Sequence, residues 1–298
     1  MGTDNAPALL REAGLRNMMT ALGWRVEDLP DLDFDRIVVS SEDEQAEAAF
    51  YGNAKNHLIV GKGTEMLADM VEEKMKDGRF PLILGGDHSV GIGSLAGILR
   101  ARPDTGVLWI DAHADLNTPD ISESGNMHGM PVGLMMEGVA PQPMNIPGLE
   151  WLDKTPKLKP KSIAYIGLRD VDAAERKLIM SLGIAAFTMS DIDRYGIGHV
   201  MDLALHHLLA KNPNRPLHLS YDIDAVDPVL APATGTAVRG GLTFREAHYV
   251  AEAAASSGNL ASADVVELNP TLSHDDGAQA TLDLGLQIIT SLMGKSII

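Results

Sequence analysis

The sequence predicts an α/β fold of three layers, in which helices cover both faces of a doubly wound, mostly parallel β-sheet. Two observations predict it. Short runs that are apolar on both faces of a strand alternate with stretches whose apolar residues recur at helical spacing. In addition, 45% of the 298 residues are hydrophobic, which is enough to fill the two interfaces between sheet and helices.

The expected elements follow in order along the chain. Two helices come first, over residues 6–23, where Gly23 can end the helix, and 63–78. Strands are expected at 81–84, 106–115, 162–170, 184–189, 217–224 and 263–268. Further helices are expected at 89–103, 174–183, 198–212, 243–258 and 282–294. Residues 117–160 have little regular pattern, and a loop of this length is usually functional or disordered.

Composition excludes several classes of function. The net charge of −17 argues against binding to nucleic acid or to an anionic membrane and weakly favours cationic small molecules. No apolar run approaches the ~20 residues of a membrane span, and the first residues do not resemble a signal peptide. The chain contains no cysteine, so thiolate chemistry is excluded. A cytoplasmic protein is therefore predicted.

Four of the predicted strands end in, or lead directly to, acids or histidines. They are His88; Asp111, His113 and Asp115; Asp222 and Asp224; and Glu267. Side chains two apart on a strand share a face, so Asp222 and Asp224 should point together, as should Asp111 and His113 if their strand continues that far. In parallel sheets, ligands bind beyond the carboxyl ends of the strands. These side chains are therefore expected to form one site.

Packing several carboxylates beside an apolar core is costly unless cations neutralise them. Four aspartates and two histidines suit Mn²⁺, Fe²⁺, Co²⁺ or Zn²⁺ better than Ca²⁺, and four negative charges balance two divalent ions. Each motif alone could be a solvated strand end or a glycine-rich turn, but the three together favour a metal centre. Asp87 is expected to hold a ligand in place.

Two other histidines need separate interpretations. His128 lies between Gly125 and Gly129 in the long loop, where it could transfer protons or simply face solvent. His218 shares a face with Asp222 but lies deeper in its strand, so a core position is predicted.

The stretches GGDHS, DAHADLNTP and SYDIDAVDP resemble the three metal-binding signatures of the ureohydrolase family, which includes arginases, agmatinases and formiminoglutamases. The resemblance extends from about Asn5 to Met293. Four further stretches, SGNMHGMPV, YIGLRDVDAAE, PATGTAVRGGLT and VVELNP, are similar to the arginase branch in particular. The resemblance implies the fold shared by arginases and deacetylases.

The resemblance also implies hydrolysis of the guanidinium of L-arginine to L-ornithine and urea by a metal-bridging hydroxide. It implies two Mn²⁺ per subunit, with the ligands His88, Asp111, His113, Asp115, Asp222 and Asp224. Asp115 would also steady the hydroxide, His128 would transfer protons, and Glu267 would pair with the guanidinium. The substrate-binding residues would be Thr236 beside Glu267; Asn117, Ser124 and Asn126 for the α-carboxylate; and Asp172 and Glu175 for the α-amino group.

One domain, residues 1–298, is expected. Compared with the family pattern, this domain is expected to lack the usual first strand and the longer carboxyl-terminal tail. A homo-oligomer, with a trimer favoured, is expected. Two alternatives stay open at this point: another guanidino hydrolase such as an agmatinase, and a metal-binding scaffold with impaired catalysis.

Overall fold

Six parallel strands form one sheet in a computed structural model that describes residues 2–50 and 52–296. The strands are β1 (Leu82–Leu84), β2 (Gly106–Ile110), β3 (Ile163–Leu168), β4 (Ala185–Thr188), β5 (Leu217–Asp222) and β6 (Leu260–Val266). Their order across the sheet is β1-β6-β5-β2-β3-β4, and each neighbouring pair is parallel. The predicted α/β fold is confirmed.

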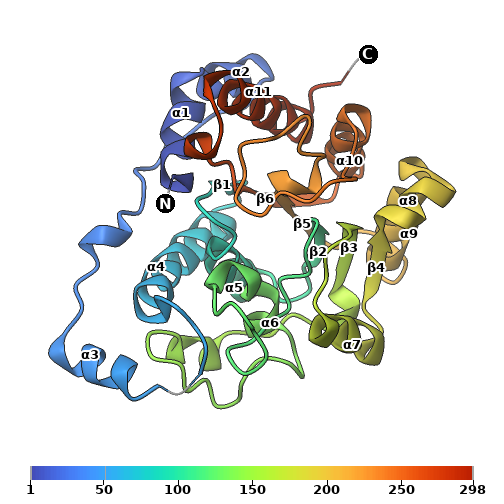
Figure 1. Ribbon diagram of the computed structural model, residues 1–298. Helices are drawn as coiled ribbons and strands as arrows, with labels where there is room; N and C mark the ends of the chain where they lie inside the picture. The colour runs from blue at the N-terminus through green and yellow to red at the C-terminus, as the bar shows by residue number, and fades with distance from the viewer. Residues whose placement is uncertain (1, 51, 297–298) are drawn as a thin grey trace.

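Helices cover both faces of this sheet (Figure 1). One face packs against α1 (Ala6–Glu12), α2 (Leu15–Ala21), α8 (Met189–Tyr195), α9 (Ile197–Leu209), α10 (Phe244–Ser256) and α11 (Asp275–Leu292). The other packs against α4 (His57–Lys76), α5 (Val90–Ala101), α6 (Pro131–Met135) and α7 (Ala173–Leu182). The remaining elements are α3 (Ser41–Ala48) and the 3₁₀ turns η1 (Thr3–Asn5), η2 (Phe34–Arg36), η3 (Met127–Gly129), η4 (Glu150–Lys154), η5 (Pro160–Ser162), η6 (Ile223–Ala225) and η7 (Pro270–Leu272).

The alternation of side chains along β2 explains the three layers. Leu108 and Ile110 belong to the core on the α9, α10 and α11 side, whereas Val107 and Trp109 belong to the core on the α5 and α6 side. All four side chains are fully buried. A strand buried on both faces reads as a continuous apolar run, which is the pattern seen in the sequence.

Several elements differ from the prediction, among them one helix and two strands. The helix expected over 6–23 is divided into α1 and α2, because Gly14 adopts a left-handed conformation with φ 92°. The strands expected to reach residues 115 and 224 end earlier, at Ile110 and Asp222. In both cases an aspartate accepts a hydrogen bond from the backbone N–H two residues on, His113 N to Asp111 at 2.7 Å and Asp224 N to Asp222 at 2.8 Å, and this turn ends the strand.

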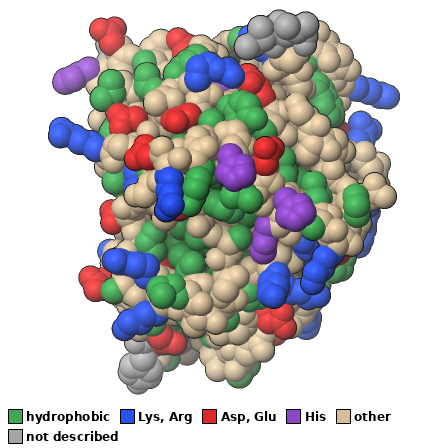
Figure 2. Space-filling view, turned by 90° about the vertical axis from the view of Figure 1, so that its right-hand side faces the viewer, with side chains coloured by type: hydrophobic (Ala, Val, Ile, Leu, Met, Phe, Trp, Pro, Cys, Tyr) green, Lys and Arg blue, Asp and Glu red, His purple; other side chains and the backbone are tan. Residues whose placement is uncertain are grey.

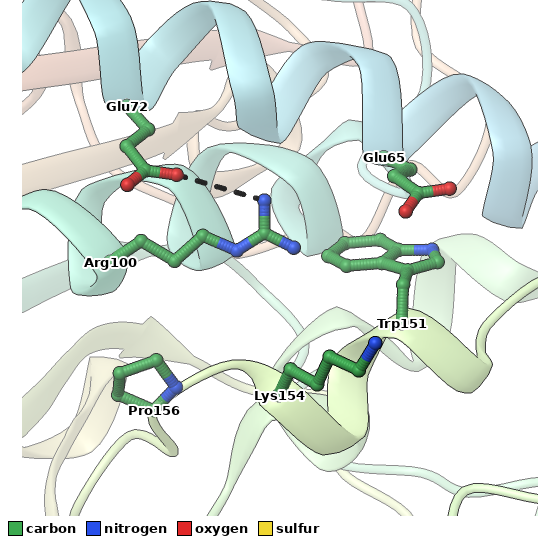
Figure 3. A pocket seen from close by; sticks show the side chains of 6 residues that line it. All are labelled: Glu65, Glu72, Arg100, Trp151, Lys154 and Pro156. Atoms are coloured by element: carbon green, nitrogen blue, oxygen red, sulfur yellow. Dashed lines mark ion pairs between the residues drawn. The ribbon is translucent and has the colours of Figure 1, made fainter.

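Helix α5 is held closely against α4. A Cβ atom at Gly93 would lie 2.6 Å from the Thr64 carbonyl oxygen, so only glycine permits this approach. At the far end of α5, the Arg100 guanidinium lies over the Trp151 ring, 4.9 Å from its centroid, at a surface hollow of about 490 Å³ (Figure 3). His88 lies two residues before this helix.

Two surface properties complete the description. Figure 2 shows acidic and basic side chains interspersed with apolar ones on one face of the molecule, so the net charge of −17 is not gathered into a single acidic field there. Within residues 2–50 and 52–296, no helix combines the length and the apolar character needed to cross a bilayer.

Candidate metal centre

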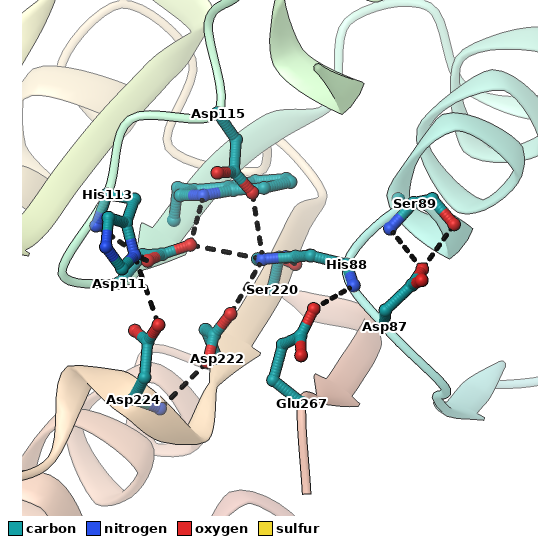
Figure 4. A network of polar contacts seen from close by, with 12 residues as sticks. Asp87, His88, Ser89, Asp111, His113, Asp115, Ser220, Asp222, Asp224 and Glu267 are labelled. Carbon is teal, nitrogen blue, oxygen red and sulfur yellow. Dashed lines mark hydrogen bonds and ion pairs between the residues drawn. The ribbon is translucent and has the colours of Figure 1, made fainter. Parts of the chain in front are cut away.

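The predicted residues meet where the winding of the sheet reverses. The chain runs outward from β2 to β3 and β4, then returns to place β5 on the other side of β2. Such a switch point leaves a crevice at the carboxyl ends of the two strands, and this is where ligands bind in open α/β sheets. Asp111 follows β2, and Asp222 ends β5, at this point of the sheet (Figure 4).

Two groups of potential metal ligands lie here, and they share Asp111. The first contains His88, Asp111 and Asp222, and the second contains Asp111, His113 and Asp224. Asp111 presents Oδ2 to His88 Nδ1 at 3.1 Å and Oδ1 to His113 Nδ1 at 3.4 Å. A carboxylate that faces two ligand groups with different oxygens can bridge two cations.

Around His88, three carboxylates converge on one ring nitrogen. Nδ1 lies 3.1 Å from Asp111 Oδ2, 3.1 Å from Asp115 Oδ2 and 3.2 Å from Asp222 Oδ2. The other ring nitrogen, Nε2, lies 2.8 Å from Ser220 Oγ. The structure therefore brings Asp115 to the first group as well.

In the second group, which contains His113, hydrogen bonds to Asp224 position the side chains. His113 Nδ1 lies 3.1 Å from Asp224 Oδ2, which also accepts a hydrogen bond from Thr236 Oγ1 at 2.8 Å. The other oxygen of Asp224 accepts from Ala112 N at 3.2 Å. Behind this group, Arg169 donates to the carbonyl oxygens of Asp224 and Val238 and so fixes the loop that carries Thr236.

Protons accumulate on these side chains because the cluster is anionic. Burial, and then the charge of Asp111, raise the pKa of Asp115 to about 7. Burial lowers the pKa of His113, but hydrogen bonds to Asp111 and Asp224 outweigh it and raise this pKa to about 12. Burial, and then the neighbouring Asp224, raise the pKa of Asp222 well above its ordinary value. Groups that hold protons so strongly are poised to exchange them for metal cations.

Two buried atoms support this interpretation directly. His88 Nδ1 and Asp115 Oδ2 are both buried and have no hydrogen-bond partner among the described residues. Buried polar atoms are nearly always satisfied, so two of them facing each other at 3.1 Å require an explanation. An imidazole nitrogen and carboxylate oxygens are ligands of first-row divalent metals, and the donor set therefore fits such an ion.

Backbone strain marks the same site. In the described chain, the non-glycine residues with positive φ are Asn56, Asp115 at 49° and Glu267 at 63°. Strained conformations of this kind concentrate at functional sites, where the surrounding structure enforces them. At Glu267, the backbone N–H donates to the Gly86 carbonyl at 3.0 Å, and the side-chain Oε1 accepts from the backbone N–H of His88 at 2.8 Å. Burial, and then the charge of Asp87, raise the pKa of Glu267 to about 8.

The long loop places the other predicted residues near this edge of the sheet. His128 lies in η3, half-buried, and burial lowers its pKa. Ser124 is exposed, and its Oγ accepts from Asn126 N at 3.2 Å. The segment before α4 braces the loop, because Asn53 donates to the Ser122 and Glu123 carbonyls and Lys55 Nζ donates to Asn126 Oδ1 at 3.2 Å.

Asn117, Asp172 and Glu175 form a connected group at the start of α7. Asn117 Nδ2 donates to Asp172 Oδ2 at 2.9 Å. Both carboxylate oxygens of Glu175 accept backbone N–H groups, from Leu116 at 2.9 Å and from Asp172 at 3.0 Å. Glu175 is thus buried as a brace between the long loop and α7, and Asp172 is the exposed carboxylate of the group.

Sequence reasoning missed several supporting residues. Trp109 donates from Nε1 to Asp111 Oδ2 at 3.0 Å, and Ser220 contacts His88. Each lies two residues before an aspartate of the cluster, so the two-residue period of a strand could have identified both. Asp87, expected to hold a ligand, accepts instead from Ser89 N at 3.0 Å and from Ser89 Oγ at the start of α5.

Comparison with known proteins gives consistent matches. A family model described as "Arginase family" matches residues 1–294. The arginase of Eremothecium gossypii is 44% identical over 300 residues, covering 100% of this chain and 73% of the relative. Among solved structures, arginase from Bacillus subtilis matches with a TM-score of 0.85 and 38% identity, covering 100% of this chain and 94% of that one. Entamoeba histolytica arginase in complex with L-ornithine matches with a TM-score of 0.81 and 29% identity, covering 99% and 93%.

Proposed function

This chain belongs to the arginase family, and on that premise we propose that it hydrolyses the guanidinium group of L-arginine to L-ornithine and urea. The observation that carries the proposal is the pair of His/Asp groups that share Asp111, set beside the strained carboxylate of Glu267. In the reaction, water adds to the guanidinium carbon, the bond to the side-chain nitrogen breaks, and that nitrogen leaves as the amine of ornithine.

We propose that two Mn²⁺ ions bind at this site. The ligands would be His88, Asp111, Asp115 and Asp222 for one ion and His113, Asp111 and Asp224 for the other. Imidazole mixed with carboxylates suits Mn²⁺, and the unpartnered Nδ1 of His88 supports a metal on its side. When bound, such ions lower the pKa of water and supply a nucleophile at neutral pH.

The protein side chains orient the substrate and move protons. A guanidinium is planar and always charged, so a carboxylate such as that of Glu267 can pair with it and fix its plane. The leaving amine needs a proton, which Asp115 and then His128 would supply. Because burial keeps the pKa of His128 low, its imidazole is neutral near pH 7 and can accept a proton from solvent water or from a neighbouring acid.

The two ends of arginine would be recognised by different groups. We propose that Asn117, Ser124 and Asn126 bind the α-carboxylate, and that Asp172 binds the α-amino group, with Glu175 holding Asp172 in place. The relative crystallised with L-ornithine supports an amino-acid substrate, since that ligand is the expected product. Agmatine lacks the carboxylate and could not make these three contacts.

A urea-release assay tests the proposal. Protein stripped of metal should be inactive, added Mn²⁺ should restore activity, and arginine should be hydrolysed far faster than agmatine. Equal rates with both substrates would contradict the assigned carboxylate contacts. No urea at saturating Mn²⁺ would favour the impaired scaffold.

Four features stay predictions from the sequence: one domain, a trimer, the manganese itself and a cytoplasmic location. Light scattering on the purified protein tests the trimer, and elemental analysis of protein purified without added metal tests the manganese.

A further inference from the structure

A line of polar side chains runs through the interior of the sheet, away from the metal centre. On β5, Leu217, Leu219 and Tyr221 face the core on the α9 to α11 side, so the alternate residues His218, Ser220 and Asp222 face α5. On β6, the strand register places Ser262 beside His218 and Asp264 beside Ser220. We call His218, Ser220, Ser262 and Asp264 the polar seam. All four are 0% exposed.

A buried acid in a central strand needs a reason. Asp264 lies inside a sheet covered by helices on both sides, where a carboxylate is far more costly than an apolar side chain of similar size. Its Oδ1 is one of the buried atoms with no hydrogen-bond partner among the described residues. Stability alone would favour an apolar residue at this position, so the acid is expected to have another role.

The hydrogen bonds of the polar seam converge on one oxygen of that acid. Asp264 Oδ2 lies 2.6 Å from Ser94 Oγ of α5, 3.3 Å from His218 Nε2 and 3.4 Å from Ser220 Oγ. A carboxylate oxygen accepts, so each of these groups donates to it. His218 Nδ1 then accepts from Ser262 Oγ at 3.0 Å, which completes the seam.

The direction of these hydrogen bonds determines which ring nitrogen of His88 carries the proton. If Ser220 gives its only hydroxyl proton to Asp264, then Ser220 Oγ must accept from His88 Nε2, 2.8 Å away. With the proton of the neutral ring on Nε2, the lone pair lies on Nδ1, the atom that faces Asp111, Asp115 and Asp222. A histidine ligand of a metal needs this arrangement, in which the second nitrogen donates to an acceptor that fixes the tautomer.

We propose that Asp264 is a positioning residue that, through the Ser220 hydroxyl, holds His88 with Nδ1 available as a metal ligand. The proposal rests on the proposed function, because it assumes an ion on each side of Asp111. It makes an asymmetric prediction. The polar seam touches the His88 side alone, whereas the His113 side is supported by Thr236 through Asp224.

The predicted difference between the two ions is tested by titrating metal-stripped protein with Mn²⁺. Binding is measured by calorimetry and by electron paramagnetic resonance. The variants are Asp264→Asn, which keeps the shape of the side chain, and Ser220→Ala, which removes one hydroxyl. Each variant should weaken binding of the ion on the His88 side by about 10- to 100-fold and leave the affinity for the ion on the His113 side unchanged. The spectrum at limiting Mn²⁺ should change from that of a coupled pair to that of a single ion.

Two further variants provide matched comparisons. Ser291→Ala removes another buried serine hydroxyl, in α11, and should leave both affinities unchanged. Thr236→Val removes one of the hydrogen bonds to Asp224 and should weaken binding of the ion on the His113 side. The double variant with Ser220→Ala should therefore weaken binding of both ions.

The outcomes separate the two proposals. Wild-type protein that binds no Mn²⁺ removes the proposed function and this inference together. A different result overturns only the role of Asp264. In it, the wild type binds two ions, and Asp264→Asn and Ser220→Ala either leave both affinities unchanged or weaken both equally. Loss of the fold in both variants would assign the polar seam to stability and would also overturn that role.

Discussion

The imidazole of His88 lies flat against the indole of Trp109, with ring centroids 4.2 Å apart and 7° between the ring planes. The same indole donates from Nε1 to Asp111 Oδ2 at 3.0 Å. One fully buried side chain thus orients two candidate ligands that follow different strands, one by packing and one by a hydrogen bond. The aromatic residue in the stretch LWIDAHAD is therefore part of the site's architecture as well as of the core.

The substitution Trp109→Phe separates these two roles. A phenyl ring retains an aromatic face for His88 but cannot donate to Asp111, so Mn²⁺ affinity should fall by about tenfold. The smaller ring and the lost bond should also destabilise the fold by about 2 kcal/mol. Metal titration and chemical unfolding measure the two effects. Trp151→Phe, at the surface hollow beside Arg100, is the control and should not alter metal affinity; an equal loss there would contradict the assignment.

Metal affinity should depend on pH, with a sign that the pKa shifts determine. Without metal, the pKa of His113 is raised to about 12 and that of Asp115 to about 7, so protons occupy ligand atoms near neutral pH. Metal binding must displace these protons. The affinity should therefore fall about tenfold for each unit by which the pH is lowered and for each proton released. The fall should be steeper below about pH 7, where Asp115 also holds a proton. Calorimetry in buffers of different ionisation enthalpy counts these protons. An affinity that does not change with pH would show that the cluster is not the binding site.

His128→Asn should lower turnover while both ions stay bound. The side chain belongs to neither group of candidate ligands, and general acid–base catalysis contributes on the order of 100-fold or more to rates. Because burial lowers the pKa of His128, the ring carries the proton that it would supply most often below the ordinary histidine pKa, so the factor by which the variant is slower should grow as the pH falls. Urea release against pH gives the rates and elemental analysis the metal content; metal loss would reassign His128 to a structural role.

The strand ends were predictable because two simple rules apply there. An apolar run buried on both faces predicts a central parallel strand, and the carboxyl ends of parallel strands meet at one edge. These rules place His88, Asp111, Asp222 and Glu267 together without any knowledge of the strand order, and the structure has them there. The exact ends of β2 and β5 were missed, because the side chains of Asp111 and Asp222 bond to backbone N–H groups two residues on and turn the chain early.

Contacts between elements far apart in the sequence could not be predicted. Lys55 reaches Asn126, Ser94 of α5 reaches Asp264 of β6, and Arg169 binds carbonyl groups of the loop before α10. None of these residues lies at a distinctive spacing from its partner. Their roles depend on how helices pack on the sheet and not on local pattern, so they become visible only in the fold. His218 was correctly placed in the core, but its bond to Asp264 depends on the pairing of β5 with β6.

Arg100 offers a test of the packing that supports α5, independent of the metal centre. Its guanidinium lies over the Trp151 ring (Figure 3). It also pairs with Asp69 at 2.8 Å and donates from Nε to Thr155 Oγ1 at 3.2 Å. Arg100→Lys keeps the charge but loses the planar stacking and the bond from Nε, so the free energy of unfolding should fall by about 1 kcal/mol. Urea denaturation measures this change.

The matched control for that variant is Arg245→Lys. Arg245 pairs with Glu252 at 3.1 Å on the surface of α10, and its side chain is 56% exposed, compared with 17% for Arg100. Exposed pairs of this kind contribute little, so the control should change the unfolding free energy by less than about 0.5 kcal/mol. If both variants were destabilised equally, the loss would reflect the general change from a guanidinium to an ammonium group and not stacking on Trp151. A larger loss in Arg100→Lys, with Mn²⁺ affinity unchanged, would establish that α5 is anchored at its far end by this cation–π contact.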